Sequence, residues 1–133
     1  MLEIALRENQ EGVFQKEIAQ NQTLSYKYLD HIISSLKAAG LITNVRGKKS
    51  GYKLTRHPSV ISIYDIHNAF EQGICIVECL SDVVNCKVED TCATKNLWSG
   101  LNSKVIEYLS NYTLEDLMNE QKELDEKFKK EES

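Results

Sequence analysis

The sequence has no long hydrophobic run and only one proline, Pro58, among its 133 residues. No apolar stretch approaches the roughly 20 residues that a membrane-spanning helix needs. The first residues show no signal-peptide pattern, so we expect a cytoplasmic protein without membrane association. An apolar fraction of 41% and a charged fraction of 27% are typical of globular proteins and exclude wholesale disorder.

Signatures of catalysis are also missing. The three histidines, His31, His57 and His67, are spread one per predicted element, and no Ser/His/Asp set accompanies them. No glycine-rich loop that would hold a phosphate is present either. An enzyme is therefore the least supported class of function, and we predict no catalytic residue.

Acidic and basic residues are divided unevenly along the chain. Residues 1–57 contain nine basic and five acidic residues, a net charge of +4, and residues 58–133 contain seven basic and fifteen acidic residues, a net charge of −8, which together give the overall −4. Five basic residues without an acidic neighbour lie in one short window: Arg46, Lys48, Lys49, Lys53 and Arg56. This window is either a solvated loop or a contact surface for phosphates.

Helical patterns dominate the first forty residues. Residues 2–6 resemble the end of an apolar-faced helix, and residues 13–20 form a second short amphipathic segment. A third helix is predicted to begin after Ser25 as N-cap and to end at Gly40. Its apolar stripe recurs at helical spacing and consists of Leu29, Ile32, Ile33, Leu36 and Ala39.

A β-hairpin follows the third helix. Residues 41–45 and 52–54 alternate as strands do, and residues 46–51 form a turn rich in glycine and lysine. Three helices followed by a hairpin match a winged helix-turn-helix. We therefore predict a mainly α-helical fold with a small β-hairpin wing, and residues 1–57 as its DNA-binding domain, closed by Pro58.

The second half of the chain is predicted to form a cysteine loop and a dimerisation helix within residues 58–118. A helix is expected at residues 62–71 and an ordered loop at residues 73–92. From residue 93 apolar residues recur over about five turns, a wide face that suggests a partner helix in a homodimer. Thr113 to Asp116 resembles a capping box, and residues 119–133 are expected to form a charged tail of frayed or mobile helix.

The polar N-terminal end of the third helix is the candidate DNA-reading surface, because recognition helices read bases with this end. The alternative interpretation is the solvent-exposed face of an ordinary amphipathic helix. The neighbouring basic hairpin makes this alternative less favoured. The predicted DNA-binding residues are Ser25, Tyr26, Lys27, Tyr28, Asp30, His31, Arg46, Lys48, Lys49 and Lys53. Among them Arg46 opens the wing, where a guanidinium can enter a narrow minor groove of double-stranded DNA.

Four cysteines, Cys75, Cys79, Cys86 and Cys92, lie within eighteen residues of one another. Such a cluster in a cytosolic chain indicates metal binding or redox chemistry more often than structural disulfides. Spacing alone leaves an iron–sulfur cluster, zinc, a metal-free thiol switch and unreactive cysteines open. The last three cysteines are one ligand short of four, and Cys75, His67, Glu78 and Asp90 are the candidates for the fourth position.

Several segments together resemble the Rrf2 family of bacterial transcription regulators, which includes the IscR, NsrR and CymR types. These are Tyr28-Leu29-Asp30, residues 36–42, Val45-Arg46-Gly47, residues 50–54, the cysteine loop with Leu97-Trp98, and residues 112–117. The resemblance implies a homodimer that reads a palindromic operator, and we expect a repressor. It also implies a 2Fe–2S or 4Fe–4S cluster on Cys79, Cys86 and Cys92 that sets the affinity for DNA by sensing redox state, iron or nitric oxide.

The chain departs from the family pattern at three places. Lys95 stands where some relatives have a ligand histidine. From the resemblance we also expect this sequence to begin part-way into the first helix, which in other relatives carries an acidic ligand. Ser50 and Asp30 replace the usual glycine and glutamate, so operator preference is expected to differ. Two rival functions stay open: a metal-free thiol-sensing regulator and a small iron–sulfur electron-transfer or carrier protein.

Overall fold

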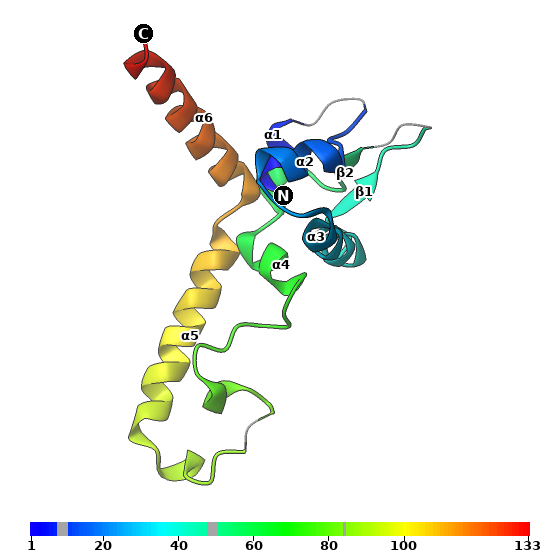
Figure 1. The fold of residues 1–133 in the computed structure, drawn as a ribbon. Helices are drawn as coiled ribbons and strands as arrows, with labels where there is room; N and C mark the ends of the chain where they lie inside the picture. Colours follow the sequence, from blue (N-terminus) through cyan, green and yellow to red (C-terminus); the bar gives the residue numbers. More distant parts are fainter. Residues whose placement is uncertain (8–10, 48–50, 84) are drawn as a thin grey trace.

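The computed structural model describes residues 1–7, 11–47, 51–83 and 85–133. Its first unit is a winged helix-turn-helix, which confirms the predicted fold class (Figure 1). The unit consists of α1 (Leu2–Leu6), α2 (Gln15–Asn21), α3 (Tyr26–Ala38), β1 (Ile42–Asn44) and β2 (Tyr52–Leu54). The strands pair antiparallel, with Ile42 opposite Leu54 and Asn44 opposite Tyr52.

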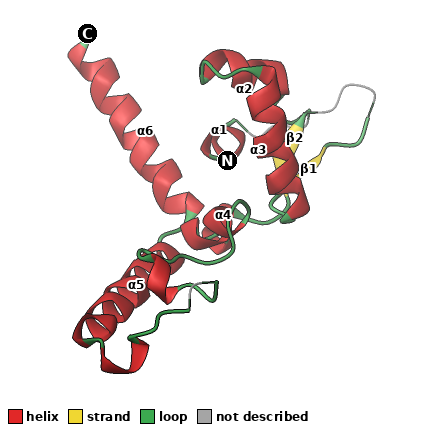
Figure 2. Cartoon of the chain, turned by 60° about the horizontal axis from the view of Figure 1, so that its bottom comes forward, coloured by secondary structure: helices red, strands yellow, loops and turns green. Residues whose placement is uncertain are grey.

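The second half is built from helices. A 3₁₀ turn η1 (Pro58–Val60) leads into α4 (Ile63–Asn68), and two further 3₁₀ turns, η2 (Glu78–Leu80) and η3 (Glu89–Thr91), lie in the cysteine segment. Two long helices follow, α5 (Ala93–Asn111) and α6 (Leu114–Glu131). Figures 1 and 2 show α3 and the hairpin on the side of the molecule that faces away from α6. No helix of the described ranges is both long and apolar enough to span a lipid bilayer.

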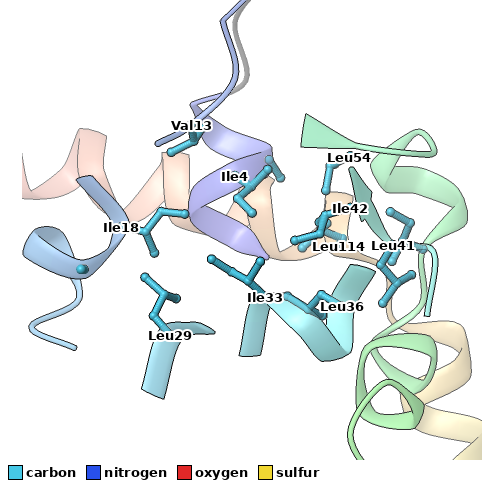
Figure 3. Packing of buried hydrophobic residues seen from close by; sticks show 13 residues of the cluster. Ile4, Val13, Ile18, Leu29, Ile33, Leu36, Leu41, Ile42, Leu54 and Leu114 are labelled. Carbon is cyan, nitrogen blue, oxygen red and sulfur yellow. The ribbon is translucent and has the colours of Figure 1, made fainter. Parts of the chain in front are cut away.

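One hydrophobic core joins the two halves of the chain. Ile61 is fully buried and Leu114 is 1% exposed, and both belong to the cluster formed by the winged-helix unit (Figure 3). The Ile63 backbone N–H donates to the carbonyl of Tyr112 (2.8 Å), and the Leu114 N–H donates to the carbonyl of Ile61 (2.9 Å). The cluster consists of Ile4, Ala5, Val13, Ile18, Ala19, Leu29, Ile33, Leu36, Leu41, Ile42, Leu54, Ile61 and Leu114.

The predicted helix at residues 13–20 is wrong at its first residues. Val13 is extended and exchanges two backbone hydrogen bonds with Tyr52, so α2 begins only at Gln15. Gly12 and Gly51 allow this isolated bridge, because a Cβ on Gly51 would lie 2.6 Å from the Gly12 carbonyl carbon and one on Gly12 would lie 2.8 Å from the Gly51 carbonyl carbon. A pairing across forty residues leaves no local sequence signal.

One other predicted boundary differs from the structure. The helix expected at residues 62–71 ends at Asn68, with Ala69 as its C-cap. The charged residues after Asn119 continue α6 as regular helix to Glu131, although few apolar residues anchor them. The expected mobility of this tail and the proposed domain boundaries stay predictions.

Helices α2 and α3 end in the same Schellman motif. The N–H of Leu24 donates to the Ala19 carbonyl and that of Leu41 donates to the Leu36 carbonyl, both at 3.0 Å. The motif places its C′ residue in the left-handed region, which is Gly40 (φ +69°) after α3 but Thr23 (φ +53°) after α2. A β-branched residue is strained there, so the helix-turn-helix carries local strain at Thr23.

Exchanging these two residue types tests the strain. Thr23→Gly is expected to stabilise the fold by about 0.5–1 kcal/mol, since relief of strain exceeds the added entropy of the unfolded chain. Gly40→Thr is expected to destabilise it by about 1–2 kcal/mol, although open space surrounds Gly40. Urea unfolding at one fixed protein concentration measures both, and a lower midpoint for Thr23→Gly would contradict the assignment.

Candidate nucleic-acid interface and cysteine segment

The N-terminal end of α3 is exposed and polar. Tyr26 and Tyr28 are 52% and 58% exposed, and Lys27, Asp30 and His31 are also exposed. These side chains lie on the faces that Leu29, Ile33 and Leu36 do not use, because those three point into the core (Figure 3). The side chains of the predicted surface therefore do not contribute to the hydrophobic core.

Ser25 has a structural task at this end of the helix. It is the N-cap, and its hydroxyl accepts a hydrogen bond from the Tyr28 backbone N–H (3.2 Å). The cap fixes the start of α3, so the side chains of the first turn have defined directions. The sequence predicted this cap correctly.

The hairpin places further basic residues beside α3. Arg46 and Lys53 are exposed, and the hairpin is closed by a hydrogen bond from the Val45 N–H to the Gly51 carbonyl (3.0 Å). The predicted residues Lys48 and Lys49 lie outside the described residues. Lys37 joins α3 to the hairpin, since its ammonium donates to the Asn44 side chain (2.7 Å) and lies 6.0 Å from the centre of the Tyr52 ring.

Gln15 connects the three elements of the interface. Its amide nitrogen donates to the carboxylate of Asp30 on α3, and its amide oxygen accepts from the Tyr52 hydroxyl on β2 (3.5 Å). The Asp30 carboxylate therefore helps to hold α2 against α3, although the Asp30 side chain is exposed to solvent. This role could not be predicted from sequence, because Gln15 is an ordinary polar residue at a helix start.

The cysteine segment lies beside the N-terminal end of α5, away from α3 (Figure 1). All four cysteines are free thiols, with Cys75 and Cys79 exposed and Cys86 and Cys92 half-buried. None of the described residues from 73 to 92 is fully buried. Because the segment is weakly packed, its rearrangement costs little free energy.

Cys92 and Lys95 have shifted protonation equilibria. A hydrogen bond with the Thr94 hydroxyl (Sγ to Oγ1, 3.2 Å) lowers the pKa of the Cys92 thiol, and the neighbouring Lys95 ammonium adds to the effect. The ion pair with Glu89 raises the pKa of Lys95. The Lys95 side chain is therefore a protonated ammonium that pairs with Glu89, and an ammonium does not bind metal.

The cysteine segment has the donor types that an iron–sulfur cluster needs, but it does not bring them close enough together. Three soft thiols on one segment are the donors that such clusters prefer. Within the described ranges, however, no three His, Cys, Asp or Glu side chains are close enough together to hold a metal ion. Cys79, Cys86 and Cys92 are thus not gathered, nor do His67, Glu78, Asp90 or Cys75 complete a site with them.

A sequence profile of the Rrf2 family, described as an iron-dependent transcriptional regulator, matches residues 1–120. The chain belongs to the Rrf2 family. The transcriptional regulator IscR of Vibrio cholerae is 34% identical over 118 residues, which cover 89% of this chain and 68% of that protein. IscR of Pectobacterium carotovorum is 30% identical over 125 residues, 94% of this chain and 76% of its own length.

Solved structures of the family share the fold. CymR of B. subtilis, described as the global cysteine regulator, is 36% identical with a TM-score of 0.69, and covers 89% of this chain and 86% of its own. IscR of T. potens is 30% identical with a TM-score of 0.72, at 92% and 80% coverage. Regulators of the Rrf2 family bind DNA.

The Gln15 bridge is testable by its removal. Gln15→Leu is expected to destabilise the fold by about 0.5–1.5 kcal/mol, because two hydrogen bonds between elements are lost. Gln20→Leu, at an exposed position of the same helix, is the matched control and should change stability by less than about 0.5 kcal/mol. Urea unfolding measures both, and equal effects would show that the bridge contributes nothing.

Proposed function

We propose that this chain is a dimeric transcription repressor that binds a palindromic operator and whose DNA affinity is set at Cys79, Cys86 and Cys92 by an iron–sulfur cluster. The observation that carries DNA binding is the exposed polar end of α3 beside the basic hairpin. The family's description as iron-dependent supports the iron–sulfur part.

The α3 surface offers groups of the right kind for duplex DNA. Lys27 supplies positive charge for phosphates, while Tyr26, Tyr28 and His31 supply hydrogen-bonding groups that reach phosphates or base edges. Arg46 lies at the start of the wing, where a minor groove would lie when α3 occupies the major groove. Asp30 has a free carboxylate oxygen that can accept from a cytosine amine.

An apolar stripe on α5 supports a homodimer. Leu97, Leu101 and Tyr108 are 63%, 48% and 66% exposed, and Trp98 is 37% exposed. Side chains of this size on one long helix are costly to leave in water, and a second copy of α5 would cover them. A dimer would present two copies of α3 to the two half-sites of a palindrome.

Cys79, Cys86 and Cys92 are the proposed cluster ligands. When bound, an iron–sulfur cluster supplies a group that forms, breaks down or changes redox state with the cell's iron, oxidants or nitric oxide. The protein supplies thiolates, among which Cys92 is favoured by its Thr94 hydrogen bond. The cysteine segment must rearrange to bring the three thiols together. We propose that this conformational change is what alters the DNA affinity.

A metal-free thiol sensor is the second candidate. Two observations favour it: the described cysteines are free and not gathered, and a solved relative, CymR of Staphylococcus aureus, 32% identical with a TM-score of 0.67, is described in an oxidised form. In this version oxidation of the thiols, without metal, would reorder the same segment.

Replacing Lys27 tests the DNA surface. Lys27→Ala is expected to weaken binding to a generic duplex and to reduce the slope of log affinity against log salt by about one, because one phosphate contact is lost. Lys122→Ala removes the same charge from an exposed position of α6 and should leave the slope unchanged. Fluorescence anisotropy at several salt concentrations measures the slope, and identical slopes for both variants would argue against this surface.

Replacing Cys86 tests the cluster ligands. After anaerobic reconstitution with ferrous iron and sulfide, wild-type protein should absorb between about 320 and 460 nm, and Cys86→Ala should not. Val83→Ala is the control, because Val83 lies in the same segment and is 92% exposed. Absorbance that persists in Cys86→Ala would refute its assignment as a ligand, and a colourless wild type would favour the metal-free sensor.

A further inference from the structure

Asn102 makes a two-point contact that the function described above does not use. It lies on α5, is half-buried, and faces the backbone on both sides of Cys75. Its side-chain oxygen accepts from the Ile76 N–H (2.9 Å), and its side-chain nitrogen donates to the Ile74 carbonyl (2.8 Å). An amide fits this pair because it carries a donor and an acceptor side by side.

This contact joins the cysteine segment to the middle of α5 by two hydrogen bonds. Among the described residues from 74 to 92, the other hydrogen bonds are local, within the segment or to the first turn of α5. Gly73, just before the clamped residues, is held by Asn68 at the end of α4 (3.2 Å). Figure 1 shows this stretch passing from α4 to α5.

The other end of α5 is bonded to residues 61–63, and Ile61 is buried in the core of the winged-helix unit. Tyr112, its C-cap, accepts from the Ile63 N–H, and Leu114 donates to Ile61, which is fully buried in the winged-helix core. A helix of 19 residues is a rigid rod of about 28 Å. A displacement of the cysteine segment that is transferred to α5 at Asn102 therefore reaches the core that carries α3.

We propose that Asn102 is a positioning residue that couples the state of the cysteines to the DNA-binding unit by clamping residues 74–76 onto α5. The inference rests on the proposed function, because it needs a cysteine signal that changes DNA affinity. The hydrogen bonds of Asn102 are to backbone groups of residues 74 and 76 and not to a thiol. Its effect is on the ratio of DNA affinities with and without the signal.

Two variants break the clamp in different ways. Asn102→Asp keeps the acceptor for Ile76 but has no donor for Ile74 at neutral pH, and Asn102→Leu keeps the approximate size and makes neither bond. Ser103→Asp is the control, since it adds the same charge at an exposed neighbouring position of α5. Binding to a generic duplex is measured before and after two separate treatments, anaerobic reconstitution with ferrous iron and sulfide, and alkylation of metal-free protein with N-ethylmaleimide.

The expected result is that the affinity ratio before and after treatment approaches one, to within about twofold, in both Asn102 variants. Wild type and Ser103→Asp should keep a larger ratio, and untreated Asn102 variants should bind DNA as wild type does. Hydrogen exchange at the Ile76 amide supplies a local readout, because loss of its acceptor should reduce protection in Asn102→Leu.

Two results would overturn the inference, and they are distinguishable. A wild-type ratio of one with both treatments would overturn the proposed sensing function and the coupling with it. A wild-type ratio that differs from one and is retained by both Asn102 variants would overturn only the role of Asn102. Unchanged protection of the Ile76 amide in Asn102→Leu would show that the clamp does not form in solution.

Discussion

The burial of Ile61 and Leu114 in the winged-helix core is the constraint on which the arrangement of this molecule depends. These two residues belong to the second half of the chain, yet they pack with Ile42 and Leu54 of the hairpin in one cluster. Because Leu114 opens α6 and Tyr112 closes α5, their bonds to residues 61 and 63 fix where both long helices leave the core. The α3 surface and the helix beside the cysteine segment are consequently both anchored in one core, even though the surface and the segment lie far apart.

Local signals predicted much of the fold. The Ser25 cap, the stripe from Leu29 to Leu36 and the glycine at position 40 define α3 by interactions within a few residues, and all three are present. The bridge at Val13 was missed because its partner, Tyr52, is distant in sequence and the approach requires the small size of Gly12 and Gly51. Helix was expected for the charged tail after Asn119, and α6 is helical to Glu131, but few apolar residues there reveal a packed face.

The candidate site was predictable in its residue types and less so in its geometry. Exposed polar residues at the start of α3 follow from the helical period, whereas the bridge by Gln15 depends on how three elements meet. The cysteine spacing alone left several chemistries open, and only the family resemblance implied an iron–sulfur cluster. Within the described residues the thiols are not gathered. The clamp by Asn102 has no sequence signal, since a lone asparagine on a helix is common.

The central claim is that the α3 and wing surface binds duplex DNA under the control of the cysteine segment. Selection of bound duplexes from a random library, with metal-free and anaerobically reconstituted protein in parallel, tests it most directly. The account predicts a palindromic sequence in at least one state and a different affinity for that sequence in the other, with binding that weakens steeply as salt rises. Failure of both states to retain any duplex at low salt would contradict it.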